Sequence, residues 1–159
     1  MPKAIITPDQ DAVISEIEVS APPDRVFQAL ITREQALQWG TSDAFQVIRW
    51  EMEARVGGSW RFVSKEKGSA REFDHHGKVV EIDPPRVLAY TWFANWHSDL
   101  AHETRVRWEL TPSSRGTLVK VTHSGLAKLP EACTAYSQGW PGLLNALKTF
   151  SEKQTGALA

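Results

Sequence analysis

The stretch GKVVEIDPPRVLAYTW, from Gly77 to Trp92, decides the fold of this chain. Two runs rich in valine, isoleucine and aromatic residues meet at the acidic turn Asp83-Pro84-Pro85. Proline has no backbone N–H to donate to a sheet, so it stands at strand ends and corners and not within a ladder. The stretch therefore predicts two antiparallel strands, over residues 71–82 and 86–93, joined at a proline corner.

Further strands are predicted on both sides of this corner, because apolar and polar residues alternate there with a period of two. Gly57-Gly58 and the polar loop 65–70 supply turns between them. The segment from Ala94 to Glu103 has no periodicity and is predicted to be a loop with few packing contacts. The remaining predicted strands cover residues 13–20, 48–53, 59–64, 104–111 and 117–124.

Helical spacing occurs in three places. Pro22-Pro23 precedes an i, i+4 apolar stripe, and Thr32 with Gln35 forms a capping box for a second short helix that ends at Gly40. A long final helix is predicted over residues 136–153. Because Pro141 removes one hydrogen bond within it, we expect either a helix that restarts at Trp140 or a kink near Gln138. Periodicity alone indicates an α+β fold with its sheet and helices segregated.

Three segments together carry a resemblance to a known family: ARVGGSWRF (54–62), the proline corner, and SQGWPGLLNALKTF (137–150). In this order they resemble the SRPBCC, or START-like, superfamily, and most closely the homologues of the heat-shock-protein ATPase activator, a branch grouped with polyketide cyclases. The resemblance covers about residues 12–153. It implies a helix-grip fold, in which a curved antiparallel sheet wraps around the C-terminal helix. We expect a single domain over residues 1–159 with an ordered core at about 12–153.

Composition excludes several classes of protein. The formal charge is −1 and no basic block is present, so a nucleic-acid partner is not expected. No apolar run approaches the length of a membrane span and residues 1–10 do not resemble a secretion signal, which predicts a cytoplasmic protein. Cys133 is the only cysteine, so no internal disulfide forms, and we expect a packed, inert thiol.

The residues of a ligand site can be predicted from strand parity, since alternate residues of a strand share one face of the sheet. A gap between such a face and the final helix is a natural place for a small molecule. Aromatic residues dominate these positions, which suits either a filled core or a groove for a planar, hydrophobic ligand. The predicted site residues are Trp60, Phe62, Phe73, His75, Tyr90, Trp92 and Trp108 on the strands, Trp96 in the loop 94–103, and Trp140 and Leu144 on the helix.

Histidines are the candidates for chemistry. His75 shares parity with Phe73, so its imidazole is the candidate for proton transfer inside the groove, whereas the adjacent His76 faces the opposite side. His123 ends a strand, where a structural hydrogen bond is expected. No metal is expected, because no spacing of potential ligands resembles a zinc pattern. No cofactor is expected either, since phosphate-binding, dinucleotide and nucleophile-elbow motifs are absent from the sequence.

Three functions remain open. The first is binding of a small hydrophobic or aromatic molecule in the groove, with the loop 94–103 as a lid. The second is a cyclase or hydratase acting on a polyketide-like substrate, with His75 as the base. The third, implied by the resemblance, is a co-chaperone that stimulates a heat-shock-protein ATPase. Homodimer formation is left open.

Overall fold

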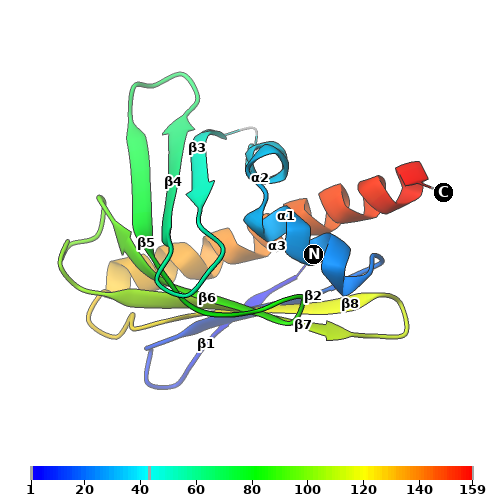
Figure 1. Cartoon of the computed structure of the whole chain (residues 1–159). Coiled ribbons are helices and arrows are strands. Elements are labelled where there is room, and N and C mark those ends of the chain that lie inside the picture. The colour runs from blue at the N-terminus through cyan, green and yellow to red at the C-terminus, as the bar shows by residue number, and fades with distance from the viewer. Residues whose placement is uncertain (1, 43, 159) are drawn as a thin grey trace.

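The computed structural model describes residues 2–42 and 44–158, which form one eight-stranded antiparallel sheet and three helices (Figure 1). The strand order is β1-β2-β8-β7-β6-β5-β4-β3. The strands are β1 (Ala4–Ile6), β2 (Val13–Val19), β3 (Phe45–Met52), β4 (Ser59–Glu66), β5 (Glu72–Asp83), β6 (Val87–Ala94), β7 (Thr104–Pro112) and β8 (Thr117–Ser124). The helices are α1 (Pro23–Ile31), α2 (Arg33–Trp39) and α3 (Pro130–Leu158).

The predicted proline corner joins β5 to β6. Asp83 pairs with Val87 across the corner, and the Arg86 backbone N–H donates to the Asp83 carbonyl at 2.7 Å. Earlier in β5 the register shifts by one residue, because Val79 pairs with Tyr90 but Glu81 pairs with the next residue back, Ala89. The extra residue, Val80, forms a bulge that bends β5, so β3, β4 and the first part of β5 rise steeply from the plane of β6–β8 (Figure 1).

Just before this bulge, Gly77 lets β5 and β6 approach closely. A Cβ atom on Gly77 would lie 1.9 Å from the Thr91 carbonyl oxygen of β6. Next to it, the Lys78 backbone N–H donates to the Thr91 side-chain oxygen at 2.9 Å in place of a regular ladder bond. Only glycine permits so close an approach of the two backbones.

The two short helices follow β2, as predicted, and a three-residue strand that the sequence did not reveal precedes it. Pro23 opens α1, and α2 ends at Gly40. The predicted capping box is wrong: Thr32 stands at the N-cap of α2 but makes no side-chain cap bond. Thr32 also ends α1, and its hydroxyl bonds instead with the Gln28 side-chain oxygen at 3.3 Å.

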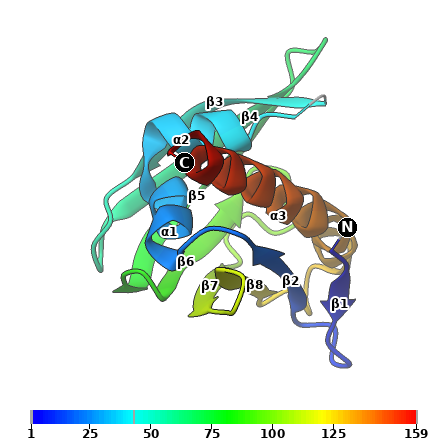
Figure 2. The ribbon, with the colours of Figure 1, turned by 90° about the vertical axis from the view of Figure 1, so that its right-hand side faces the viewer.

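The final helix is longer than predicted. It begins at Pro130, a residue suited to a first helical turn, and α3 continues through Pro141, so the predicted restart at Trp140 does not occur. Figure 2 shows α3 held on the inner side of the curved sheet, and Trp140 and Leu144 are buried. Within the described residues, none of the helices has the length and apolar character needed to span a bilayer.

The helix does not approach the whole sheet equally. The backbone of α3 lies close to β2 and β1 and to the short helices, while aromatic side chains connect it to β6 and β7. Trp92 and Trp108 from the sheet contact Trp140 from the helix, with ring centroids 5.9 and 5.6 Å away. Large aromatic rings therefore span the wider side of the gap between helix and sheet.

The contact at Gly77 generates a prediction. Gly77→Ala should lower the free energy of unfolding by roughly 2–3 kcal/mol, because the new methyl group would overlap the Thr91 carbonyl. Urea unfolding of the two proteins measures the difference. The control is Gly142→Ala in α3, where a Cβ meets nothing within 4 Å; it should leave stability equal or higher. Equal stabilities of the two variants would contradict this account of the close approach between β5 and β6.

Candidate functional site

A cleft of about 360 Å³ lies between the sheet and α3. Its wall is almost wholly apolar, and no Lys, Arg, Asp or Glu lines it. Strands β3 to β6, the loop after β6 and helix α3 all contribute to it. The lining residues are Phe45, Phe62, Ser64, Phe73, His75, Trp92, Trp96, Ala135, Tyr136, Gly139, Trp140 and Leu143.

The register of the sheet brings the strand residues together. Phe62 pairs with His75, and Ser64 pairs with Phe73, across the antiparallel β4–β5 ladder. Directly opposed residues of two strands project from the same face, so all four reach the cleft. On α3, Ala135, Gly139 and Leu143 recur every four residues and form one stripe along the cleft.

Six of the ten predicted site residues line the cleft: Phe62, Phe73, His75, Trp92, Trp96 and Trp140. The other four belong to the core beneath: Trp60, Tyr90 and Trp108 on the expected side of the sheet, and Leu144 on the helix. Trp60 donates its indole N–H to the Thr91 carbonyl at 2.7 Å, and Trp108 donates to the Tyr90 hydroxyl at 2.9 Å. Leu144 is fully buried. Strand parity predicts the face of the sheet but not the distance from the opening, which explains the difference.

Six lining residues were not predicted. Ser64 has the same parity as Phe62, and Tyr136 and Leu143 belong to the apolar pattern of the helix, so signals for these three existed in the sequence. Nothing in the sequence distinguishes Phe45 at the edge of the sheet. Ala135 and Gly139 contribute to the cleft because their small size leaves space between the helix and the sheet. No pattern of residue types in the sequence indicates such a space.

His75 is held in one neutral form. Its Nδ1 atom lies 3.2 Å from the Phe62 carbonyl, to which it donates, and its Nε2 atom accepts the Trp96 indole N–H at 3.0 Å. Burial lowers the pKa of His75 to about 4, more than the backbone hydrogen bond raises it. At neutral pH the imidazole is uncharged and its lone pair is already occupied by Trp96.

A second imidazole, His123, lies fully buried behind the cleft. The Thr104 hydroxyl donates to the Trp92 carbonyl at 2.8 Å and therefore accepts from His123 Nε2, 2.9 Å away. His123 Nδ1 then accepts the Trp140 indole N–H at 3.2 Å. Burial holds the pKa of His123 well below its ordinary value, so this histidine is a neutral structural connector, as expected.

The Tyr136 hydroxyl connects the sheet, the loop and the helix. It accepts the Trp92 indole N–H at 2.8 Å and donates to His97 Nε2 at 2.6 Å. Burial lowers the pKa of His97 to about 4 and raises the pKa of Tyr136 above its ordinary value. Both groups are therefore neutral at pH 7.

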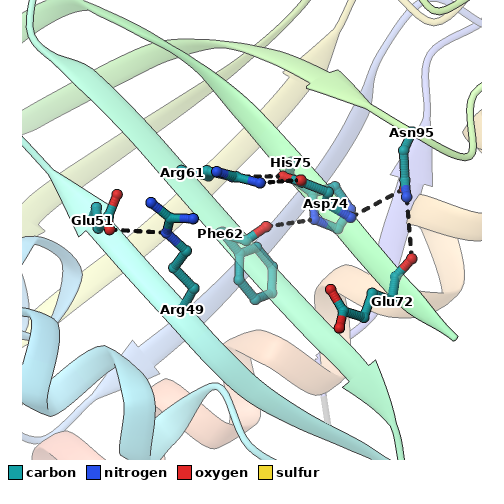
Figure 3. A network of polar contacts seen from close by, with 8 residues as sticks. All are labelled: Arg49, Glu51, Arg61, Phe62, Glu72, Asp74, His75 and Asn95. Atoms are coloured by element: carbon teal, nitrogen blue, oxygen red, sulfur yellow. Dashed lines mark hydrogen bonds and ion pairs between the residues drawn. The ribbon is translucent and has the colours of Figure 1, made fainter. Parts of the chain in front are cut away.

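The loop after β6 is anchored, and the prediction of few packing contacts there is wrong. Asn95 bonds through its side chain to the Asp74 backbone N–H and the Glu72 carbonyl, both at 3.1 Å (Figure 3). Asp74 is itself paired with Arg61 at 2.6 Å. Further along, His102 contacts the Gly125 carbonyl at 2.7 Å. Hydrogen bonds of individual side chains thus hold this loop in place. Such bonds leave no periodic pattern in the sequence, so the sequence analysis could not detect them.

The site offers little machinery for chemistry. Within the residues that the structure describes, no group of three or more His, Cys, Asp or Glu could hold a metal ion. Cys133 is buried outside the cleft, and burial raises the pKa of its thiol. What the cleft presents to a molecule is a set of aromatic ring surfaces and one serine hydroxyl.

The buried imidazoles predict how stability depends on pH. His75 and His97 stay neutral in the folded chain down to about pH 4, whereas the unfolded chain protonates them near pH 6.5. The unfolded state therefore binds more protons in this window, and the free energy of unfolding should fall as pH falls, by up to ~1.4 kcal/mol per pH unit for each imidazole. Urea unfolding between pH 7 and pH 4.5 measures this slope.

A pair of adjacent variants tests the cause. His75→Gln should make the slope shallower because it removes one buried imidazole. His76→Gln, on the exposed outer face, should leave the slope unchanged. The same slope in both variants would show that buried His75 does not contribute.

Comparison with known proteins agrees with this architecture. The family model described as Activator of Hsp90 ATPase homolog 1-like protein matches residues 20–152. Protein CV1439 from Chromobacterium violaceum is 26% identical, with a TM-score of 0.76 over 89% of this chain and 98% of that chain. CalU16 from Micromonospora echinospora is 18% identical, with a TM-score of 0.65 over 99% of this chain and 87% of that chain.

The AHSA1-like protein from Aeromonas hydrophila is 18% identical, with a TM-score of 0.73 over 91% of this chain and 94% of that chain. No curated protein matches the chain. The family model covers most of the sequence, including every strand from β3 to β8 and the cleft-lining part of α3. The chain therefore belongs to the family of activator of Hsp90 ATPase homolog 1-like proteins, the branch that its sequence resembles.

Proposed function

We propose that this protein binds a small hydrophobic or aromatic molecule in the cleft between the sheet and α3. One observation carries the proposal: the polar atoms of the aromatic and histidine side chains in the wall bond to one another or to the backbone, so ring surfaces face the cleft. Trp92, Trp96 and Tyr136 form one such group, with ring centroids 6.0 Å apart for Trp92–Tyr136 and 5.1 Å for Trp96–Tyr136. Apolar, concave sites of this kind suit planar ligands.

The geometry favours binding over catalysis by a cyclase or hydratase. Proton transfer requires a base with a free lone pair within reach of the substrate. The Nε2 lone pair of His75 accepts from Trp96, and the lining contains no carboxylate that could act as its partner. An enzyme of this type would have to break the Trp96 contact before His75 could act.

Stimulation of a heat-shock-protein ATPase is the third candidate. The description of the family model names such an activity. A co-chaperone acts through contact with another protein, whereas the proposed binding depends on the cleft, so substitutions inside the cleft separate the two functions. The cytoplasmic location and the absence of a nucleic-acid partner remain predictions, and homodimer formation stays open.

Gly139 offers a direct test of the cleft. It lines the cleft, and a Cβ atom on it would meet nothing within 4 Å. Gly139→Leu should place a side chain in the cleft and reduce affinity for the neutral fluorescent probe N-phenyl-1-naphthylamine by at least about tenfold, since it removes room for roughly one ring. Stability should not fall, because leucine favours the helix more than glycine. Fluorescence titration and thermal unfolding measure the two effects.

The control variant places a leucine one residue earlier in the helix, at position 138. Gln138 is exposed and lies outside the cleft, so Gln138→Leu should bind the probe like wild type. Equal affinity in both variants would place probe binding elsewhere, and no binding by the wild-type protein would count against the proposed function. Native mass spectrometry of protein purified from its own host would then identify the class of ligand from a co-purifying mass.

A further inference from the structure

We propose that the ligand of this cleft is a neutral molecule that carries a single hydroxyl or carbonyl oxygen on its apolar body, and that the Ser64 hydroxyl bonds to this oxygen. The inference rests on the proposed function and names the class of molecule that the cleft accepts. It follows from three observations: the position of Ser64, its unused hydrogen-bonding capacity, and the absence of charge around it.

Ser64 lies inside the molecule, in the middle of the wall. Its residue is 7% exposed, and it pairs with Val47 of β3 and Phe73 of β5. It lines both the cleft and a neighbouring groove of about 330 Å³ that extends along α3 toward Trp39. Phe45, Phe62, Gly139 and Leu143 also line both spaces, so Ser64 stands at their junction. An elongated ligand in the cleft would pass this hydroxyl.

The Ser64 hydroxyl differs from every other polar side chain of the lining. The indole N–H groups of Trp92, Trp96 and Trp140 are all donated to protein acceptors. His75 uses both of its nitrogens, and the Tyr136 hydroxyl both accepts and donates. Among the described residues, no side-chain hydrogen bond of Ser64 is formed. Ser64 lines the cleft, so a ligand that displaces water from it leaves this hydroxyl without a partner unless the ligand itself carries a hydroxyl or carbonyl oxygen.

The surroundings of Ser64 select against charge. Bringing an anion into an apolar site without a cationic partner is strongly unfavourable. The cleft lining contains no Lys or Arg, and its one histidine is neutral at pH 7. The guanidinium of Arg71 lies 4.7 Å from the centroid of the Phe73 ring, but Arg71 is exposed and does not line the cleft. A phenol or an aryl ketone fits these conditions, whereas an aromatic carboxylate does not.

Three probes of one shape test the inference: naphthalene, 2-naphthol and 2-naphthoate. Equilibrium dialysis at pH 7 measures their affinities for the wild-type protein and for Ser64→Ala. Wild type should bind 2-naphthol about fivefold to tenfold more tightly than the Ser64→Ala variant does, the usual worth of one hydrogen bond. Naphthalene should bind both proteins equally. The carboxylate should bind wild type at least about tenfold more weakly than 2-naphthol.

The control is Ser98→Ala, which removes a hydroxyl from an exposed serine in the loop after β6, outside the lining. It should leave all three affinities unchanged. Equal losses of naphthalene and 2-naphthol in Ser64→Ala, or wild-type binding of 2-naphthoate as tight as that of 2-naphthol, would overturn the inference while the proposed function stands. Failure of all three probes to bind wild type would overturn both.

Discussion

The long helix α3 lies across the inner face of an eight-stranded sheet, and the rest of the structure depends on this constraint. The backbone of α3 packs close to β1 and β2, whereas the backbones of β4 to β7 lie farther from it. Tryptophan, tyrosine and phenylalanine rings span that distance. Where the helix carries only Ala135 and Gly139, the rings do not close the gap, and the cleft results.

The aromatic filling creates a second requirement, since each indole and phenol brings a polar atom into an apolar space. In this protein, histidine side chains provide hydrogen-bond partners for these polar atoms. His75 and His123 each accept an indole N–H on one nitrogen and bond to another part of the chain through the other. His97 accepts from Tyr136 and so fastens the loop after β6 to α3. The imidazoles that attract attention as possible catalytic groups thus serve as neutral connectors between elements.

Sequence reasoning predicted the fold well because its signals are local. The period-two strands, the proline corner and the apolar pattern of the final helix all lie within short windows, and they gave the correct elements. The strand Ala4–Ile6 and residues 130–135 of α3 were missed because three residues show no period and because Pro130 also suits a loop. The site was predicted in part. Parity selected the correct face, but whether Trp60 or Phe62 reaches the opening depends on the distance of the helix from the sheet. The bonds of Trp96 and His97 join residues far apart in the chain, and no pattern within one segment encodes them.

The internal pairing of the polar atoms has a consequence for how this protein can evolve. Phe45, Ala135 and Leu143 line the cleft without carrying a polar side-chain atom, so substitutions among them reshape the space without leaving a buried donor or acceptor unsatisfied. The residues that stabilise the fold are thus different from the residues that shape the cleft for its ligand. A new ligand preference can arise by single apolar substitutions along neutral or nearly neutral paths, while the connectors behind the cleft keep the fold intact.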